Sequence, residues 1–84
     1  MEEIKLGTVD DYFSKVGAVT LTLEDSLKVG DTIHIKGHTT DLTQRISSMQ
    51  IEHAEVGEAK PGDAVGVKVE QKVHEQDSVY KIIC

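Results

Sequence analysis

Two histidines, His34 and His38, have a spacing that could support metal chemistry. On a helix, two histidines four positions apart share one face and can bind zinc together. Here Gly37 separates them in a strand-to-turn context, and neither a cysteine nor a carboxylate completes the ligand set that zinc needs. We therefore predict histidines that face solvent, and no metal or other cofactor.

Nucleophilic and nucleotide chemistry is not indicated either. Serine and threonine are frequent, but no serine stands in the strained, glycine-flanked elbow of a nucleophilic enzyme. The chain also lacks the phosphate-binding spacing in which glycine is followed, after four residues, by glycine, lysine and serine or threonine. The sequence thus predicts a noncatalytic protein that does not bind GTP.

A few aromatic and basic side chains could contact a partner. Tyr12 and Lys15 lie at the first predicted hairpin loop, and a ring that stacks on a base beside a lysine is a common way of binding RNA. Phe13 could instead fold back to cap the core, because aromatic residues make up only 4% of the chain. Lys36 and Arg45 belong to a segment, 27–45, in which basic residues outnumber acidic ones by one.

The overall charge opposes nonspecific binding to nucleic acid or to an anionic membrane. Nine Lys and Arg stand against fifteen Asp and Glu, which gives a net charge of −6. Any RNA contact would therefore be weak, local and dependent on salt. The alternative is that the basic residues are ordinary solvated surface.

The length of 84 residues allows one domain with one core. A composition of 38% hydrophobic and 29% charged residues is typical of a soluble globular domain. We see no leader-like segment and no stretch near the roughly 18 apolar residues of a membrane span, so we expect a cytoplasmic monomer without membrane contact. The single cysteine, Cys84, excludes an internal disulfide and is expected to be an exposed thiol.

Apolar residues alternate with polar ones, as in half-buried strands, and do not recur at helical spacing. Gly30-Asp31, Gly37 and Pro61-Gly62 separate the alternating segments with residues that favour turns. We predict an all-β fold in which six strands form a closed barrel, since closure leaves no unpaired edge. The predicted strands are 3–10, 16–23, 31–37, 41–53, 64–71 and 78–83.

The same alternation predicts further details. In 41–53 the apolar parity changes between Ile46 and Met49, which indicates a β-bulge near Ser47-Ser48. Residues 56–59 could form one short helical turn, and Leu27 with Val29 could plug one end of the barrel. The predicted core residues are Val19, Leu21, Ile33, Ile35, Met49, Ile51, Val65, Val67 and Val69.

Three blocks of the sequence resemble the second domain of translation elongation factor Tu and of the archaeal and eukaryotic factor that delivers aminoacyl-tRNA. Gly7-Thr8-Val9 resembles the opening strand of that barrel, and residues 27–33 resemble its turn into the third strand. The third block is 48–53 followed by 58–66. Because the likeness spans about residues 4–82, the chain resembles a free-standing copy of this domain without its GTPase domain.

The resemblance implies a role in protein biosynthesis. The segment corresponding to Gln50–His53 helps to hold the aminoacyl end of tRNA in elongation factor Tu, and His53 matches the archaeal and eukaryotic factor. The first interpretation is a noncatalytic module that contacts RNA or the ribosome. Its contact residues would be Tyr12, Lys15, Lys36, Arg45, Gln50 and His53.

The alternative interpretation is a protein-interaction or accessory module, like similar barrels appended to larger proteins, including some peptidase-like enzymes. The positions of the basic residues on the folded surface distinguish the two interpretations. One contiguous face would favour RNA, whereas scattered positions would favour a protein partner.

Overall fold

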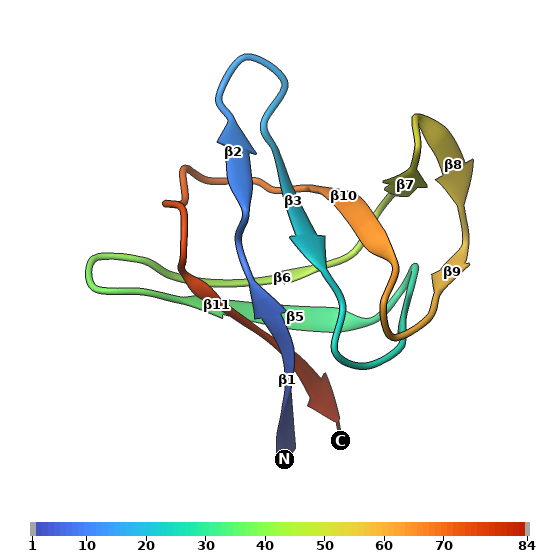
Figure 1. The fold of residues 1–84 in the computed structure, drawn as a ribbon. Helices are drawn as coiled ribbons and strands as arrows, with labels where there is room; N and C mark the ends of the chain where they lie inside the picture. Colours follow the sequence, from blue (N-terminus) through green and yellow to red (C-terminus); the bar gives the residue numbers. More distant parts are fainter. Residues whose placement is uncertain (1, 84) are drawn as a thin grey trace.

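The computed structural model describes residues 2–83, which fold into short antiparallel strands (Figure 1). The first sheet has the order β1 (Glu2–Thr8), β11 (Ser78–Ile83), β5 (Thr32–Lys36) and β6 (Asp41–Arg45). The second has the order β2 (Asp11–Phe13), β3 (Ala18–Thr22), β10 (Ala64–Lys68), β7 (Met49–Ile51) and β8 (Ala54–Val56). A two-stranded ladder joins β4 (Leu27–Lys28) to β9 (Glu58–Ala59). The predicted all-β class is confirmed.

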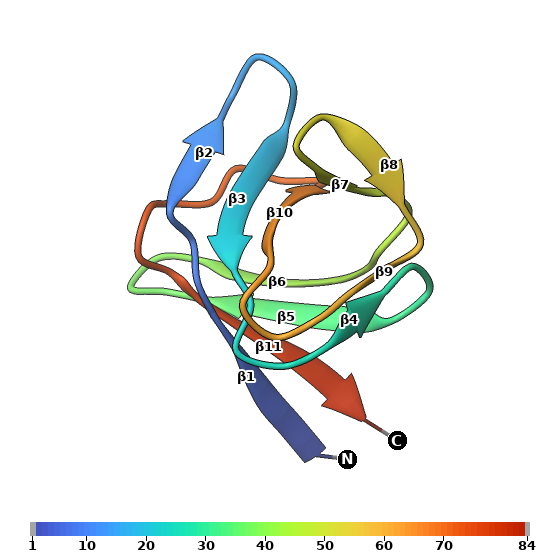
Figure 2. The same ribbon diagram turned by 45° about the vertical axis from the view of Figure 1, so that its right-hand side comes forward.

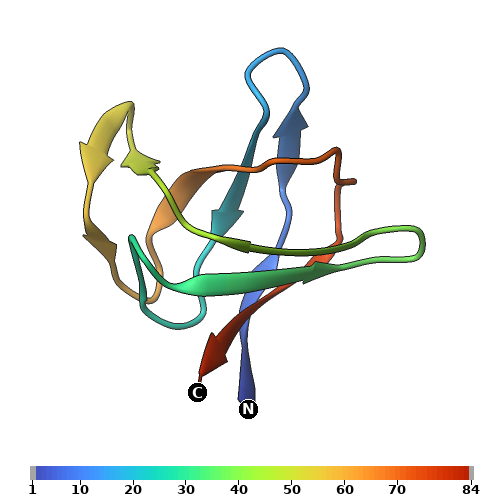
Figure 3. The ribbon, with the colours of Figure 1, turned by 180° about the vertical axis from the view of Figure 1, so that it is seen from behind.

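The two larger sheets curve around one core (Figures 2 and 3). Within residues 2–83 the ladders form three separate sheets, so the predicted closed six-stranded barrel is not found. The described residues contain no helix long and apolar enough to cross a membrane. Cys84, expected to be an exposed thiol, lies outside the described residues.

The chain turns from the first sheet toward the second at a bulge in β1. The register of β1 with β11 shifts between Lys5 and Gly7. Beside the bulge, the Leu6 carbonyl accepts a hydrogen bond from the amide of Glu24, with an N–O distance of 2.7 Å. Gly7 has a φ of +144°, and a Cβ at this position would lie 2.7 Å from the carbonyl oxygen of Thr22. Glycine is therefore required where the strand bends between the sheets.

A second crossing replaces the predicted long strand 41–53. β6 ends at Arg45 and β7 begins at Met49 in the other sheet, so this segment forms two strands rather than one bulged strand. Between them, Ile46 donates to the carbonyl of Asp31 (2.8 Å) and accepts from the amide of Gly30 (3.0 Å). The change of parity in the sequence thus marks a change of sheet. Strands that switch sheets form the corners of barrel-like sandwiches.

A buried side-chain amide links the sheets beside this crossing. Gln44 of β6 donates through Nε2 to the carbonyl of Lys68 (2.9 Å) and accepts at Oε1 from the amide of Glu70 (2.8 Å). This bidentate contact satisfies the backbone where β10 ends and no strand continues the ladder. Unpaired buried polar groups are costly. This contact avoids the cost on both sides, because it satisfies the Gln44 amide and the two backbone groups that the amide bonds.

The predicted core is confirmed with one exception. Eight of the nine predicted positions are buried, whereas Ile51 is only partly buried against the core. Leu27 is buried as expected, but Val29 is exposed, so it does not plug the end of the fold. Residues 56–59 do not form a helical turn, because β8 and β9 pair there with β7 and β4.

Two turns of the chain have the same construction. Lys28-Val29-Gly30-Asp31 and Lys60-Pro61-Gly62-Asp63 each place a positive φ on glycine, +98° and +94°. In each turn the aspartate amide donates to the lysine carbonyl, at 3.1 and 3.0 Å. The aspartate carboxylate in turn accepts from the lysine amide, at 3.1 and 2.9 Å. A glycine with positive φ at the third position is the requirement of a type II turn.

We expect Gly62→Ala to destabilise the fold by about 1–2 kcal/mol, because alanine is strained at positive φ. A Cβ at position 62 would meet no atom within 4 Å, so the loss would come from the backbone alone. Gly57→Ala is the matched control, since it also meets nothing within 4 Å and has no left-handed φ. Urea denaturation of both variants measures the difference. Equal stabilities would contradict the assigned turn.

We expect Val67→Asp to unfold the domain. Val67 is buried in the core, and an unpaired carboxylate there would cost several kcal/mol, comparable to a total stability of about 5–15 kcal/mol. Circular dichroism and the dispersion of amide resonances would report the loss of structure. Lys68→Asp, which changes the exposed neighbour, should remain folded. A folded Val67→Asp protein of native stability would show that the inward face of β10 is misassigned.

Candidate functional site

A groove of about 700 Å³ lies on the outer face of the five-stranded sheet. The β2–β3 and β7–β8 hairpins rise on either side of it (Figure 2). We call this surface the hairpin groove. Its lining includes Phe13, Val16, Ala18, Thr20, Gln50, Gly66 and Lys68, with Glu52 and His53 at the tip of the second hairpin.

The floor of the hairpin groove is hollow because its outward residues are small. In the cross-strand row at its centre, Thr20 pairs with Gly66 and Gly66 pairs with Gln50. In the neighbouring row, Phe13 pairs with Ala18 and Ala18 pairs with Lys68. The alternate residues of β3 and β10 point into the core, so the same strands that form the interior also form this floor.

Exposed apolar side chains line one side of the groove. Phe13 at the end of β2 is 49% exposed and Val16 in the following turn is 64% exposed. The expectation that Phe13 caps the core is therefore wrong, because β2 runs along β3 with Phe13 on the outer face. Large apolar side chains that gather in one hollow are typical of a binding surface.

The other side of the groove ends in a strained turn. Glu52 and His53 form the two-residue connection between Ile51 and Ala54, and their φ angles are 51° and 67°. Positive φ at both positions defines a type I′ hairpin turn, which usually contains asparagine and glycine. Both side chains line the hollow.

The six predicted contact residues do not form one patch. Gln50 and His53 line the hairpin groove, whereas Tyr12 is partly buried against the core. Lys15 lies in the exposed turn between β2 and β3. Lys36 and Arg45 are at opposite ends of the β5–β6 ladder, where Lys36 pairs with Asp41 and Arg45 pairs with Thr32. Their roles in contacting a partner stay a prediction.

Several residues of the groove were not identified from the sequence, among them Val16, Ala18, Gly66 and Lys68. The available signal was Gly66, because a glycine inside an alternating strand pattern indicates a close backbone approach. The exposure of Val16 depends on the conformation of the hairpin turn, in which the amides of Val16 and Gly17 both donate to the Phe13 carbonyl. Composition does not encode this local geometry.

A second hollow, of about 480 Å³, lies beside the ends of the chain. Its lining includes Ser26, Lys81 and Ile83. The Lys81 ammonium group already donates to the carbonyl of Ser26 at 2.7 Å. Because this cation is held by the protein itself, the hollow offers less to a ligand than the hairpin groove does.

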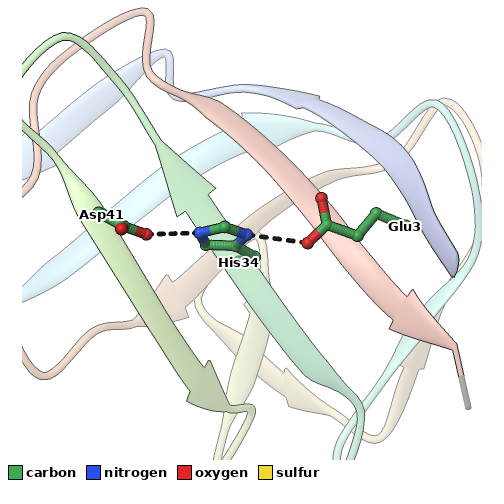
Figure 4. A network of polar contacts seen from close by, with 3 residues as sticks. All are labelled: Glu3, His34 and Asp41. Atoms are coloured by element: carbon green, nitrogen blue, oxygen red, sulfur yellow. Dashed lines mark hydrogen bonds and ion pairs between the residues drawn. The ribbon is translucent and has the colours of Figure 1, made fainter. Parts of the chain in front are cut away.

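His34 lies between two carboxylates on the outer face of the four-stranded sheet (Figure 4). Its Nε2 is 2.6 Å from Oδ1 of Asp41, and its Nδ1 is 2.9 Å from Oε2 of Glu3. The hydrogen bond to Asp41 is the main cause that raises the pKa of His34 above 6.5, followed by the bond to Glu3, while burial opposes the shift. Both ring nitrogens donate only in the imidazolium form, so His34 ties β1 to β5 and β6 instead of offering a free base.

Within residues 2–83 the other histidines do not gather into a metal-binding cluster either. His74 Nδ1 is 3.1 Å from the hydroxyl oxygen of Thr40, and the described residues contain no cluster of three or more potential metal ligands. Within residues 2–83, His34 and His38 therefore do not belong to a common set of metal ligands, despite their spacing. The prediction that the histidines face solvent is wrong for His34, whose side chain is only 15% exposed.

We expect the stability of the domain to fall as pH rises above 6.5. The raised pKa of His34 means that protonation favours the folded state, so this contribution is complete below 6.5 and is lost as pH passes the folded pKa. Asp41 is 82% exposed and Glu3 is 36% exposed, so solvent limits the effect to under about 1 kcal/mol. Urea midpoints between pH 6 and 8 measure it.

His34→Gln should flatten this pH profile, and His38→Gln should leave it unchanged. His38 serves as the matched control because it lies on the exposed turn after β5. An unchanged slope in His34→Gln would assign the pH dependence to other groups.

Comparison with known proteins shows similarity to proteases. No protein-family model matches the chain. A protein of Methanocaldococcus jannaschii named an uncharacterized protease is 43% identical over 79 residues, which are 93% of this chain and 19% of that protein. The chain therefore spans about a fifth of the length of this curated relative.

Solved structures show the same fold. The C-terminal domain of a candidate U32 peptidase of Geobacillus thermoleovorans superposes with a TM-score of 0.86 at 24% identity, over 96% of this chain and 93% of that domain. The selenomethionine variant of that domain gives a TM-score of 0.81 at 23% identity, over 94% of this chain and 98% of that one. At these identities the similarity concerns the arrangement of the strands.

The predicted relation to elongation factor Tu is wrong, because the similar protein and the similar structures are described as proteases or their domains. The translation-factor and RNA-binding interpretation is wrong with it. Two of the three blocks contain the type II turns at Gly30 and Gly62, where the positive φ favours glycine whatever the family. The blocks therefore report turn chemistry, which unrelated families share.

Proposed function

We propose that this chain is a noncatalytic accessory domain of a U32 peptidase-like protein. The observation that carries the proposal is the 43% identity to a protease over 93% of the chain. Because the match covers only 19% of that protease, most of the relative lies outside the matching segment and has room for a catalytic domain. The fold of the Geobacillus C-terminal domain supports the same assignment.

The positions of the chain ends suit an appended module. Glu2 of β1 pairs with Ile83 of β11, so the described chain begins and ends at the same edge of the fold (Figures 1 and 3). The turn of the β2–β3 hairpin lies at the opposite end in these views. A domain joined to a larger protein at one end presents its other end to solvent or to a ligand.

The side chains of the described residues support a noncatalytic role. His34 has both ring nitrogens engaged by carboxylates, and His74 contacts a threonine hydroxyl. A general base needs a free lone pair within reach of a nucleophile or a water. The hairpin groove itself contains His53, but its floor is made of alanine, glycine and threonine. Its chemistry favours binding over bond cleavage.

A domain exchange tests the proposal. In the M. jannaschii protease, this chain replaces the matching segment, and a second variant lacks that segment. We expect the chimera to cleave casein at the rate of its parent, because 43% identity over 79 residues implies that the two segments share a fold. The 84-residue chain alone should leave casein intact, as read by mass spectrometry.

Two outcomes would contradict the proposal. One is cleavage of casein by the isolated chain at a rate proportional to its concentration. The other is a chimera as impaired as the deletion variant, which would show that this chain cannot take the place of the matching segment.

A further inference from the structure

Gly66 at the floor of the hairpin groove is not required by the fold. It lies in the middle of β10, whose register with β3 and β7 has no shift. Its φ is not left-handed, and an added Cβ would lie 3.9 Å from the carbonyl oxygens of Gln50 and Val19, an ordinary contact. Glycine weakens a strand interior and often marks a place where another molecule approaches the backbone. The missing side chain keeps the groove open.

The Glu52-His53 turn is a second feature that opposes local preference. Asparagine and glycine adopt two consecutive positive φ angles more readily than glutamate and histidine do. Here the less favourable pair presents its two side chains to the groove. Strained residues persist where binding depends on them, so two such positions around one hollow indicate a ligand site.

The groove has a cationic end and an acidic end. Lys68 is the last residue of β10 and pairs with Ala18, whereas Glu52 follows Gln50 toward the Ala64 end of the same strand. Four residues of strand, about 13 Å, separate these two ends. Among residues 2–83, no carboxylate forms an ion pair with the Lys68 ammonium group.

The cationic end also contains the apolar side of the groove. Phe13 and Lys68 flank Ala18 in one cross-strand row, about 10 Å apart, with only a methyl group between them. A ligand that sits over Ala18 would therefore meet an apolar ring on one side and an ammonium group on the other. The C-terminal residue of a polypeptide has this form, because its side chain and its carboxylate diverge from the same Cα.

We infer that the hairpin groove binds the C-terminal end of a polypeptide, with the terminal carboxylate on Lys68 and an apolar terminal side chain against Phe13 and Val16. About four extended residues fit between Lys68 and Glu52. The exposed amide of Gln50 offers both a donor and an acceptor to the bound backbone. Capture of a terminal carboxylate is an established mode of peptide recognition.

The lining favours a peptide over a nucleic acid. A phosphate backbone requires several cations along one track, and the groove supplies Lys68 as its single lysine. The source of the peptide rests on the proposed function, since a protein associated with proteolysis meets newly formed polypeptide termini.

The binding test uses an acetylated peptide of three alanines and a C-terminal leucine, titrated into the ¹⁵N-labelled chain at low salt. We expect shifts at Ala18, Gly66 and Lys68 and a Kd on the order of 0.1 mM, as suits a short ligand in a shallow groove. The same peptide with a C-terminal amide should bind at least about tenfold more weakly, because it lacks the charged partner of Lys68. Equal binding of both peptides would overturn the inference.

Matched variants locate the contact. Lys68→Gln should weaken binding of the free-acid peptide about tenfold, so that the free-acid and amidated peptides bind equally. Lys68→Arg should retain most of the preference for the free acid. Lys72→Gln, which removes a lysine outside the groove, should bind like the wild type. Equal losses in Lys68→Gln and Lys72→Gln would show that only overall charge matters, and would overturn the inference.

Gly66→Val fills the groove without disturbing the fold, and so tests binding independently of stability. Valine suits a strand interior and meets no close contact through its Cβ, so the variant should be at least as stable as the wild type while its binding is lost. Unchanged binding in a folded Gly66→Val protein would overturn the inference. So would an oligouridine that shifts the groove resonances while the peptide does not.

The binding and exchange experiments fail independently. A successful chimera with no peptide binding would overturn only the inference about the groove. Peptide binding by a chain that cannot replace the protease segment would overturn only the proposed function.

Discussion

The side-chain amide of Gln44 is the interaction on which the relation of the two sheets depends. It bonds the backbone at Lys68 and at Glu70, at the point where β10 leaves its ladder. No strand of the described fold pairs with both β6 and β10, so this amide takes the place of a ladder between the sheets. The same amide fixes the end of β10, and therefore the backbone position of Lys68 at the cationic end of the groove.

The sequence predicts the interior well because the interior follows a simple rule. A strand of period two that packs on one core must alternate, and this alternation identifies Val19, Leu21, Val65 and Val67 without further information. The outer face has no such rule. Its hollow depends on which outward residues are small, and only the register of β3, β10 and β7 brings Ala18, Gly66 and Gln50 together.

The corners of the fold are less predictable than its strands. The change of parity after Ile46 is visible in the sequence, but both a bulge within one sheet and a crossing between two sheets produce it. The crossing is decided by bonds from Ile46 to the turn at Gly30 and Asp31, which are distant in sequence. The family resemblance failed for a related reason, since its motifs lie where turn geometry restricts the choice of residue.

The pairing of Glu2 with Ile83 determines how the domain responds to mechanical force. A pull on both ends of the described chain loads the β1–β11 ladder. Because the strands are antiparallel and both are gripped at the same end, the force acts along the hydrogen bonds rather than along the strands. The ladder therefore opens one residue pair at a time, from Glu2 and Ile83 inward, and the bulge at Gly7 is the first irregularity that the opening meets. Tension in a larger protein would peel this domain apart at low force, starting at the end opposite the turn of the β2–β3 hairpin.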